Sequence, residues 1–333
     1  MKEIGTIYKD FKVDSENSIH FLEVFKSIFN IEFSQRLLNE LDYTYDCYQE
    51  LIDKYELMED IEKNEFNQAM YFNETVFLHR MEIESEKGKQ LLIESLVDED
   101  VRKDSIGYIC EKNLKYNNII VANIKRLHTI LMDGVAPKEA KYKSFRKDDN
   151  FFVGFWKDNE HIHVQYFPPL ADSIEEAMEL ILIYLNDPEL NKKEPNVYMN
   201  SNWVDFDKKY TLLVQPLIVQ ALLVILQAFN DGNSRTARVI SSATILKHTN
   251  HLFDKEYQLP LLYLSRGYFA FREQYRNLIK AIAINPCSET WNQWIIFSLH
   301  AIQAYIETCN RSIDDNKLIK YKNGVKKRVL DKQ

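Results

Sequence analysis

The chain has 333 residues, with 42 Lys and Arg against 50 Asp and Glu, so its formal net charge is −8. An acidic surface of this kind repels phosphate backbones, which argues against a nucleic-acid-binding protein. Hydrophobic residues make up 45% of the chain and there are only eight Gly and eight Pro, which excludes disordered and fibrous classes and favours a largely helical, globular chain. The length indicates about two domains, or one core with an added module.

Cysteine spacing and hydropathy indicate the compartment. The four cysteines stand far apart, with neither a C-x-x-C pair nor a metal-ligand spacing to histidine: Cys47, Cys110, Cys287 and Cys309. Residues 1–10 lack the apolar run of a signal peptide or membrane anchor. The longest apolar stretch, Leu212 to Leu226, is broken by polar residues and is too short to span a bilayer. We therefore expect reduced thiols, a cytoplasmic location and no membrane partner.

Helical patterns dominate the first 132 residues. Apolar residues recur at helical spacing between residues 18 and 64, which predicts two or three helices there. A further helix is expected over residues 75–96, and another over residues 117–132. The second of these should end at Asp133-Gly134, because glycine commonly terminates a helix.

The pattern changes between residues 140 and 169. Apolar and aromatic residues at 151–156 and 161–166 flank the turn candidate at 157–159, which predicts the one β-hairpin of the chain. Pro168 and Pro169 should end the hairpin.

Helical patterns then resume. A helix is predicted from Ser173 to Leu185, followed by a polar surface loop from Asn186 to Asp207. The stretch from Leu212 to Leu226 is apolar on nearly every face, which predicts a buried central helix.

A polar segment follows this buried helix and reads Q-A-F-N-D-G-N-S-R-T-A-R from 227 to 238. It predicts a loop leading into a helix that is capped by Ser234 or Thr236, with Arg235 and Arg238 near its start. Such a helix start attracts phosphate, two arginines add bidentate contacts, and Asp231 beside a phosphate could hold magnesium. On spacing alone, however, we favour a simple helix-to-helix turn with a solvated basic end.

The segment also resembles the motif H-P-F-x-D-G-N-G-R-x-x-R of the Fic (filamentation induced by cAMP) family. The matching residues are Phe229, Asp231, Gly232, Asn233, Arg235 and Arg238. The stretch Lys143 to Arg146 is similar to the family's G-x-Y-R, the hairpin to its flap, and the N-terminal region to its Fic/DOC N-terminal module. The resemblance implies an all-α fold, namely the Fic fold helical core with one β-hairpin flap.

The resemblance also divides the chain. It implies an N-terminal helical module, a Fic core that contains the flap hairpin and the motif loop, and a last part of C-terminal helices and a basic tail. The expected ranges are 1–115 for the module, with an inhibitory helix at about 75–96; 116–257 for the core, with the flap at 145–167 and the motif loop at 227–238; and 258–333 for the last part.

Fic proteins of this kind transfer AMP from Mg-ATP to a hydroxyl of a target protein. The resemblance implies that Asp231 binds Mg²⁺ and that the ATP phosphates lie on the residues that follow it. The residues expected to bind phosphate are Gly232, Asn233, Ser234, Arg235 and Arg238. The flap would align a target segment bearing a Ser, Thr or Tyr hydroxyl by adding it as a strand. A homodimer is also expected from the resemblance.

One departure falls on the catalytic position, because Gln227 stands where the motif has histidine. A carboxamide cannot serve as the general base, and losing that base costs roughly 10²- to 10⁴-fold in rate. Ala228 and Ser234 also replace the usual proline and second glycine. We therefore expect a Mg-nucleotide-binding pseudoenzyme with impaired or absent AMP transfer. The alternatives are an active adenylyltransferase, a de-AMPylase, or a protein-binding module with a vestigial nucleotide site.

Two further expectations concern catalysis and regulation. We interpret His161 and His163 as surface residues of the hairpin and His128 as a core residue, so none is expected to replace the missing base. The stretch Arg80 to Ser85 resembles the family's inhibitory motif [ST]-x-x-x-E-[GN]. The resemblance implies that Glu84 pairs with the second motif arginine, or that it supports AMP removal as in some relatives.

Overall fold

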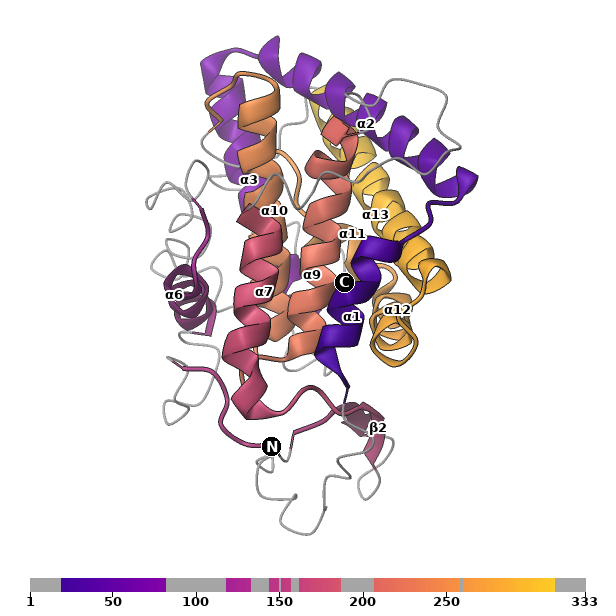
Figure 1. Ribbon diagram of the computed structural model, residues 1–333. Coiled ribbons are helices and arrows are strands. Elements are labelled where there is room, and N and C mark those ends of the chain that lie inside the picture. The colour runs from indigo at the N-terminus through magenta and orange to yellow at the C-terminus, as the bar shows by residue number, and fades with distance from the viewer. Residues whose placement is uncertain are drawn as a thin grey trace.

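The computed structural model describes residues 19–81, 118–132, 144–149, 151–156, 162–186, 207–257 and 260–314. These residues form a bundle of helices with a two-stranded sheet at one end (Figure 1). The prediction of a helical fold with one β-hairpin is confirmed. The predicted domain boundaries stay predictions.

The first helices cover the outside of the bundle. They are α1 (Phe21–Ser27), α2 (Gln35–Glu56) and α3 (Asp60–Arg80), with a short 3₁₀ turn at Ile28–Asn30. The Ser34 hydroxyl accepts a hydrogen bond from the Leu37 N–H at 3.2 Å and so caps α2. The expected start of a helix at residue 75 is wrong, because α3 runs unbroken through that position from Asp60 to Arg80. Residues 82–117, which include the rest of the expected helix, lie outside the described part.

The C-terminal helices pack against this outer layer. They are α11 (Ser265–Phe269), α12 (Arg272–Ile284) and α13 (Ser288–Asp314). Helix α2 lies along α13, and α3 lies against α11 (Figure 1). The first and last parts of the chain therefore support each other. Of the cysteines, Cys47, Cys287 and Cys309 are free thiols, and Cys110 lies outside the described residues.

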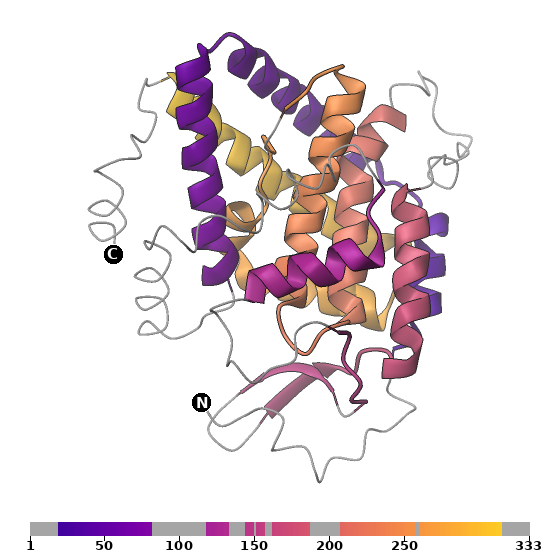
Figure 2. The same cartoon turned by 90° about the vertical axis from the view of Figure 1, so that its left-hand side faces the viewer.

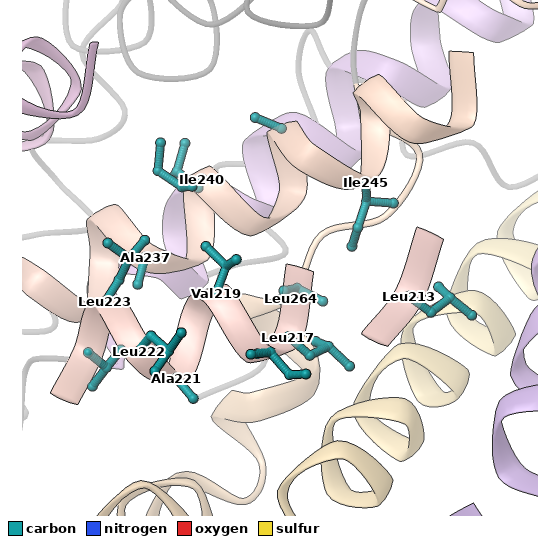
Figure 3. Packing of buried hydrophobic residues seen from close by; sticks show 14 of the residues in the cluster. Leu213, Leu217, Val219, Ala221, Leu222, Leu223, Ala237, Ile240, Ile245 and Leu264 are labelled. Carbon is teal, nitrogen blue, oxygen red and sulfur yellow. The ribbon is translucent and has the colours of Figure 1, made fainter. Parts of the chain in front are cut away.

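The centre of the bundle is the apolar segment predicted from the sequence. It comprises a π-helical turn (Tyr210–Val214) and α9 (Gln215–Leu226), in which every residue is buried. Residues 207–226 are long and apolar enough to cross a membrane, but 89% of their apolar window is buried inside the protein, as in a core helix. Figure 3 shows Leu217 and Leu222 of α9 in the core, with Ile240 in the adjoining helix α10 (Asn233–Leu252).

Two more helices flank this centre. Helix α7 (Ile174–Asn186) packs against α9, and α6 (Val121–Met132) packs against α10. Helix α6 begins at Val121 and not at Asn117 as predicted. The reason is that Asn186 binds both backbone groups of Ile119, at 3.1 Å to its N–H and 2.7 Å to its carbonyl, which keeps the preceding residues out of the helix.

The hairpin consists of β1 (Val153–Trp156) and β2 (Ile162–Tyr166), which pair antiparallel with Phe155 opposite His163. The register shifts between Val153 and Gly154, as at a β-bulge. Figure 2 shows the hairpin at the end of the bundle nearest the loop that joins α9 to α10. The expected turn at 157–159 and His161 lie outside the described residues.

Candidate functional site

The loop from α9 to α10 turns on two residues with left-handed backbone conformations. Gln227 ends α9 with φ 47° and ψ 53°, and Gly232 precedes α10 with φ 76°. A Cβ on Gly232 would lie 2.5 Å from the Met132 sulfur of α6. This position therefore requires glycine for both backbone conformation and space.

The predicted cap of α10 is wrong. Gly232 is the N-cap residue, and no side chain caps the helix. The Thr236 hydroxyl donates back to the Gly232 carbonyl at 2.9 Å, and the Ser234 hydroxyl bonds to Arg238. The first-turn N–H groups of α10 are thus not covered by a capping side chain, which leaves them suited to an anion.

Asn233 holds the loop closed. Its Oδ1 accepts the Phe229 N–H at 2.8 Å, and its Nδ2 donates to the Phe229 carbonyl at 2.7 Å. The same Nδ2 donates to Oε1 of Gln227 at 2.9 Å. One buried carboxamide therefore sets the shape of the whole turn.

The Gln227 side chain is engaged within this turn. Its Nε2 donates to the Val224 carbonyl at 2.7 Å, while its Oε1 accepts from Asn233. Tyr166 of β2 is buried beside it, and burial raises the pKa of the Tyr166 hydroxyl, an effect that the Gln227 side chain partly opposes. The Gln227 side chain thus forms a hydrogen-bonding link between α9 and the loop.

Arg146 fixes the base of the hairpin to the loop. Its Nε donates to the Gln227 carbonyl at 2.7 Å, its Nη1 to the Asp148 carbonyl at 2.9 Å, and its Nη2 to the Pro169 carbonyl. Burial lowers the pKa of Arg146, and the negative charges of the neighbouring aspartates oppose that shift. The sequence placed Arg146 in a family-like stretch but gave it no role. The structure shows three chain segments joined by one buried guanidinium.

Asp231 and Arg235 lie on the open side of the turn. The Asp231 carboxylate is 64% exposed and accepts the Gly232 N–H at 2.6 Å and Arg235 Nη2 at 3.2 Å. The Arg235 side chain is only 4% exposed, and its Nε has no hydrogen-bond partner among the described residues. A buried donor without a partner is costly.

Arg238 lies in a different environment, although it is on the same helix. It is fully buried, and its Nε donates to the Ser265 hydroxyl at 3.0 Å, its Nη1 to the Ser234 hydroxyl at 2.8 Å and its Nη2 to the Leu78 carbonyl at 2.9 Å. We call Arg238 with these three partners the Arg238 junction. It ties α10 to α3 and α11.

A buried carboxyl group completes this junction. Both oxygens of Glu74 on α3 accept the Ser265 N–H, at 3.3 and 3.1 Å. Burial raises the pKa of Glu74 to about 7, although the bond to Ser265 and the positive charge of Arg238 oppose that rise. The sequence did not predict that Glu74 is buried, because a glutamate on an amphipathic helix is usually solvated. Glu84, the expected partner of Arg238, lies outside the described residues.

The described residues contain no group of three or more His, Cys, Asp or Glu side chains that could hold a metal. Asp231 offers a single exposed carboxylate. Mg²⁺ is commonly held by one or two carboxylates together with substrate phosphates and water. The donor set therefore fits a Mg²⁺ ion that is shared with a bound nucleotide, and does not fit a metal held by the protein alone.

A cavity of about 610 Å³ lies away from the loop, between the segment before α6 and helix α7. Its lining includes Ile120, Leu182 and Ile183 and none of the loop residues. The candidate site is thus an open turn and not this cavity.

Part of the chain is similar to a known protein family, and its fold is similar to that of solved structures. Residues 118–245 match the model of the Fic/DOC family, and no curated protein matches the chain. A Fic family protein from Desulfovibrio desulfuricans G20 shares the fold, with 14% identity over 84% of this chain and 76% of that chain at a TM-score of 0.50.

Two further solved structures share the fold. A Fic domain containing signaling protein from Bacteroides thetaiotaomicron VPI-5482 has 11% identity over 83% of this chain and 97% of that chain, with a TM-score of 0.55. Fic-1 (residues 134–508) from C. elegans has 16% identity over 83% and 73% of the two chains, with a TM-score of 0.51. Residues 118–245 are thus similar to the Fic/DOC family, and the chain shares the fold of these three structures.

Proposed function

We propose that this protein binds a nucleotide together with Mg²⁺ at the α9–α10 loop and that its transfer of AMP to protein hydroxyls is impaired or absent. The observation that carries the binding half is the uncapped start of α10, where Arg235 pairs with the exposed Asp231 carboxylate. Phosphate supplies acceptor oxygens for the uncapped first-turn N–H groups of α10.

In this proposal the chain's own groups divide the work. Arg235 and the first-turn N–H groups of α10 bind phosphate oxygens, and Asp231 holds Mg²⁺ between the protein and the phosphates. The bound Mg²⁺ would neutralise phosphate charge. Gly232 lets the loop pack closely on α6, since a Cβ there would lie 2.5 Å from the Met132 sulfur.

The impaired transfer follows from Gln227. The Fic motif has histidine at this position to take the proton of the target hydroxyl, and a carboxamide takes up no proton near neutral pH. Its amide nitrogen and oxygen already bond to Val224 and Asn233. We expect transfer slower by roughly 10²- to 10⁴-fold than in the Gln227→His variant.

Calorimetric titration with Mg-ATP tests the binding half. Arg235→Ala should weaken binding about tenfold or more, and Asp231→Ala should remove its dependence on Mg²⁺. The matched control is Arg311→Ala, which removes an arginine that is 69% exposed on α13 and should leave binding unchanged. Equal, negligible heats in the wild type and all variants would contradict the proposal.

A second candidate function is a protein-binding module in which the hairpin recruits a partner segment and the nucleotide site is vestigial. The Arg238 junction favours it, because the three bonds of this arginine are all made within the protein. This candidate predicts no shift of the melting temperature with Mg-ATP. A clear upward shift would reject it.

A further inference from the structure

His128 of α6 contacts the candidate loop from the buried side. It is fully buried, and its ring stacks on Phe229 of the loop with centroids 3.7 Å apart and planes inclined by 5°. Phe145, from the segment before the hairpin, packs on the same Phe229 ring at 5.3 Å. The interpretation of His128 as a core residue holds for its burial, but its neighbours are residues of the loop.

The polar contact of His128 is with the backbone of the loop. Its Nε2 lies 2.8 Å from the carbonyl oxygen of Asp231. A carbonyl oxygen can only accept a hydrogen bond, so Nε2 carries a proton and donates it.

This bond controls one peptide group. The Asp231 carbonyl and the Gly232 N–H belong to the same planar trans peptide, so they point in opposite directions. Holding the carbonyl against α6 turns the Gly232 N–H away from α6, where it meets Oδ1 of Asp231 at 2.6 Å.

The orientation of the Asp231–Gly232 peptide needs this hydrogen bond because the peptide precedes a glycine. Glycine adopts positive and negative φ about equally well, so a flip of the Asp231–Gly232 peptide meets little steric resistance from Gly232 itself. The flipped peptide would aim the Asp231 carbonyl oxygen, with its partial negative charge, at the side where an anion should bind.

We propose that His128 is a positioning residue that fixes the orientation of the Asp231–Gly232 peptide. It thereby keeps the Gly232 N–H bonded to the Asp231 carboxylate, and holds that carboxylate on the side where a phosphate group and its Mg²⁺ would bind. The identity of this ligand rests on the proposed function, whereas the orientation of the peptide does not.

Three variants separate the parts of the His128 side chain. His128→Phe keeps a flat ring for the stack on Phe229 but has no N–H donor. His128→Gln has no ring but keeps an N–H donor on a side chain of similar reach. The control is Thr129→Val on the same helix, which removes a hydroxyl that donates to the Lys125 carbonyl at 2.8 Å.

The first readout is nuclear magnetic resonance without any ligand. In the wild type the ring ¹⁵N spectrum should show a proton on Nε2 of His128. The Gly232 amide should give one signal in the wild type, His128→Gln and Thr129→Val, and two signals or one broadened signal in His128→Phe.

A ring protonated on Nδ1 alone, or a single unshifted Gly232 signal in His128→Phe, would overturn the proposal. If His128→Phe does not fold, the ring spectrum of the wild type and the Gly232 signal of His128→Gln decide.

The second readout is Mg-ATP affinity. His128→Phe should bind about tenfold more weakly, whereas His128→Gln should stay within about threefold of the wild type. Equal losses in both variants would show that the ring stack matters and not the donor, and would contradict the proposal. If the wild type binds no nucleotide, the proposed function fails, while the Gly232 signals still decide the role of His128.

Discussion

The two arginines near the start of α10 lie three residues apart and have opposite environments. Arg235, on the loop side, pairs with the exposed Asp231 and keeps a buried Nε without a partner among the described residues. Arg238 is fully buried in the Arg238 junction, where each of its nitrogens donates to an oxygen of the protein. The comparison separates an arginine suited to a ligand from one that holds helices together.

The largest expected effect is the removal of Arg238. Arg238→Met should lower the free energy of unfolding by about 3–5 kcal/mol, because buried acceptors lose their donor and Glu74 loses its neighbouring positive charge. Arg235→Met, the matched variant, should cost less than about 1 kcal/mol, since the carboxylate that it pairs with is mostly exposed. Urea unfolding measures both costs. Equal losses of unfolding free energy in the two variants would contradict the different structural roles assigned to Arg235 and Arg238.

The environment of Arg238 also predicts that the stability of the protein depends on pH, through the buried Glu74 beside it. Burial raises the pKa of Glu74 from its usual value of 4.5 to about 7. The folded protein therefore holds this proton more tightly than the unfolded chain does. The resulting stabilisation is fully present below pH 4.5 and is lost as the pH rises through 7, with a total on the order of 3 kcal/mol.

Unfolding of wild type and Glu74→Gln at pH 5 and pH 8 measures this effect. The variant should gain stability relative to the wild type at the higher pH, because glutamine stays neutral. A difference in unfolding free energy that does not change with pH would show that Glu74 is not the titrating group.

Gly232→Ala tests the loop side. The positive φ and the predicted contact of the new Cβ with the Met132 sulfur should together cost about 2 kcal/mol of unfolding free energy. Gly154→Ala, at an exposed glycine of β1, is the control and should be close to neutral. If thermal unfolding shows equal, small shifts for both, the tight fit of the loop on α6 is wrong.

The smallest expected effect concerns Ser234, whose hydroxyl lies 2.8 Å from Arg238 Nη1 and 3.2 Å from the Tyr275 hydroxyl. Ser234→Gly should lower the free energy of unfolding by about 1 kcal/mol or less, because Arg238 keeps its bonds to Ser265 and Leu78. Thermal unfolding checks this. A loss as large as that of Arg238→Met would mean that Ser234 is the main support of the junction.

The sequence predicts the parts of the fold that depend on local pattern. Alternating residues predict the hairpin, an unbroken apolar run predicts α9, and turn residues predict the loop after Gln227. The predicted cap of α10 fails because a glycine with positive φ starts the helix and Asn233 already closes the turn. Which residue starts α10 depends on the space that α6 leaves beside the loop. A local sequence pattern contains no information about that space.

The partners inside the site could not be predicted for a similar reason. The amphipathic pattern of α6 predicts that His128 is buried, but not that it faces the Asp231 carbonyl. The pattern of α3 likewise does not show that Glu74 meets Ser265 of a helix about 190 residues later in the chain. Both contacts depend on how the helices pack.

One experiment with α-³²P-labelled ATP and Mg²⁺ tests the central claim most directly. The label bound to native protein and the label left after denaturation are counted for the wild type and Gln227→His. We predict that the wild type binds label in the native state and loses it on denaturation, whereas Gln227→His keeps covalently attached AMP on itself or on an added target. Covalent label on the wild type, or no label bound to its native form, would contradict the account.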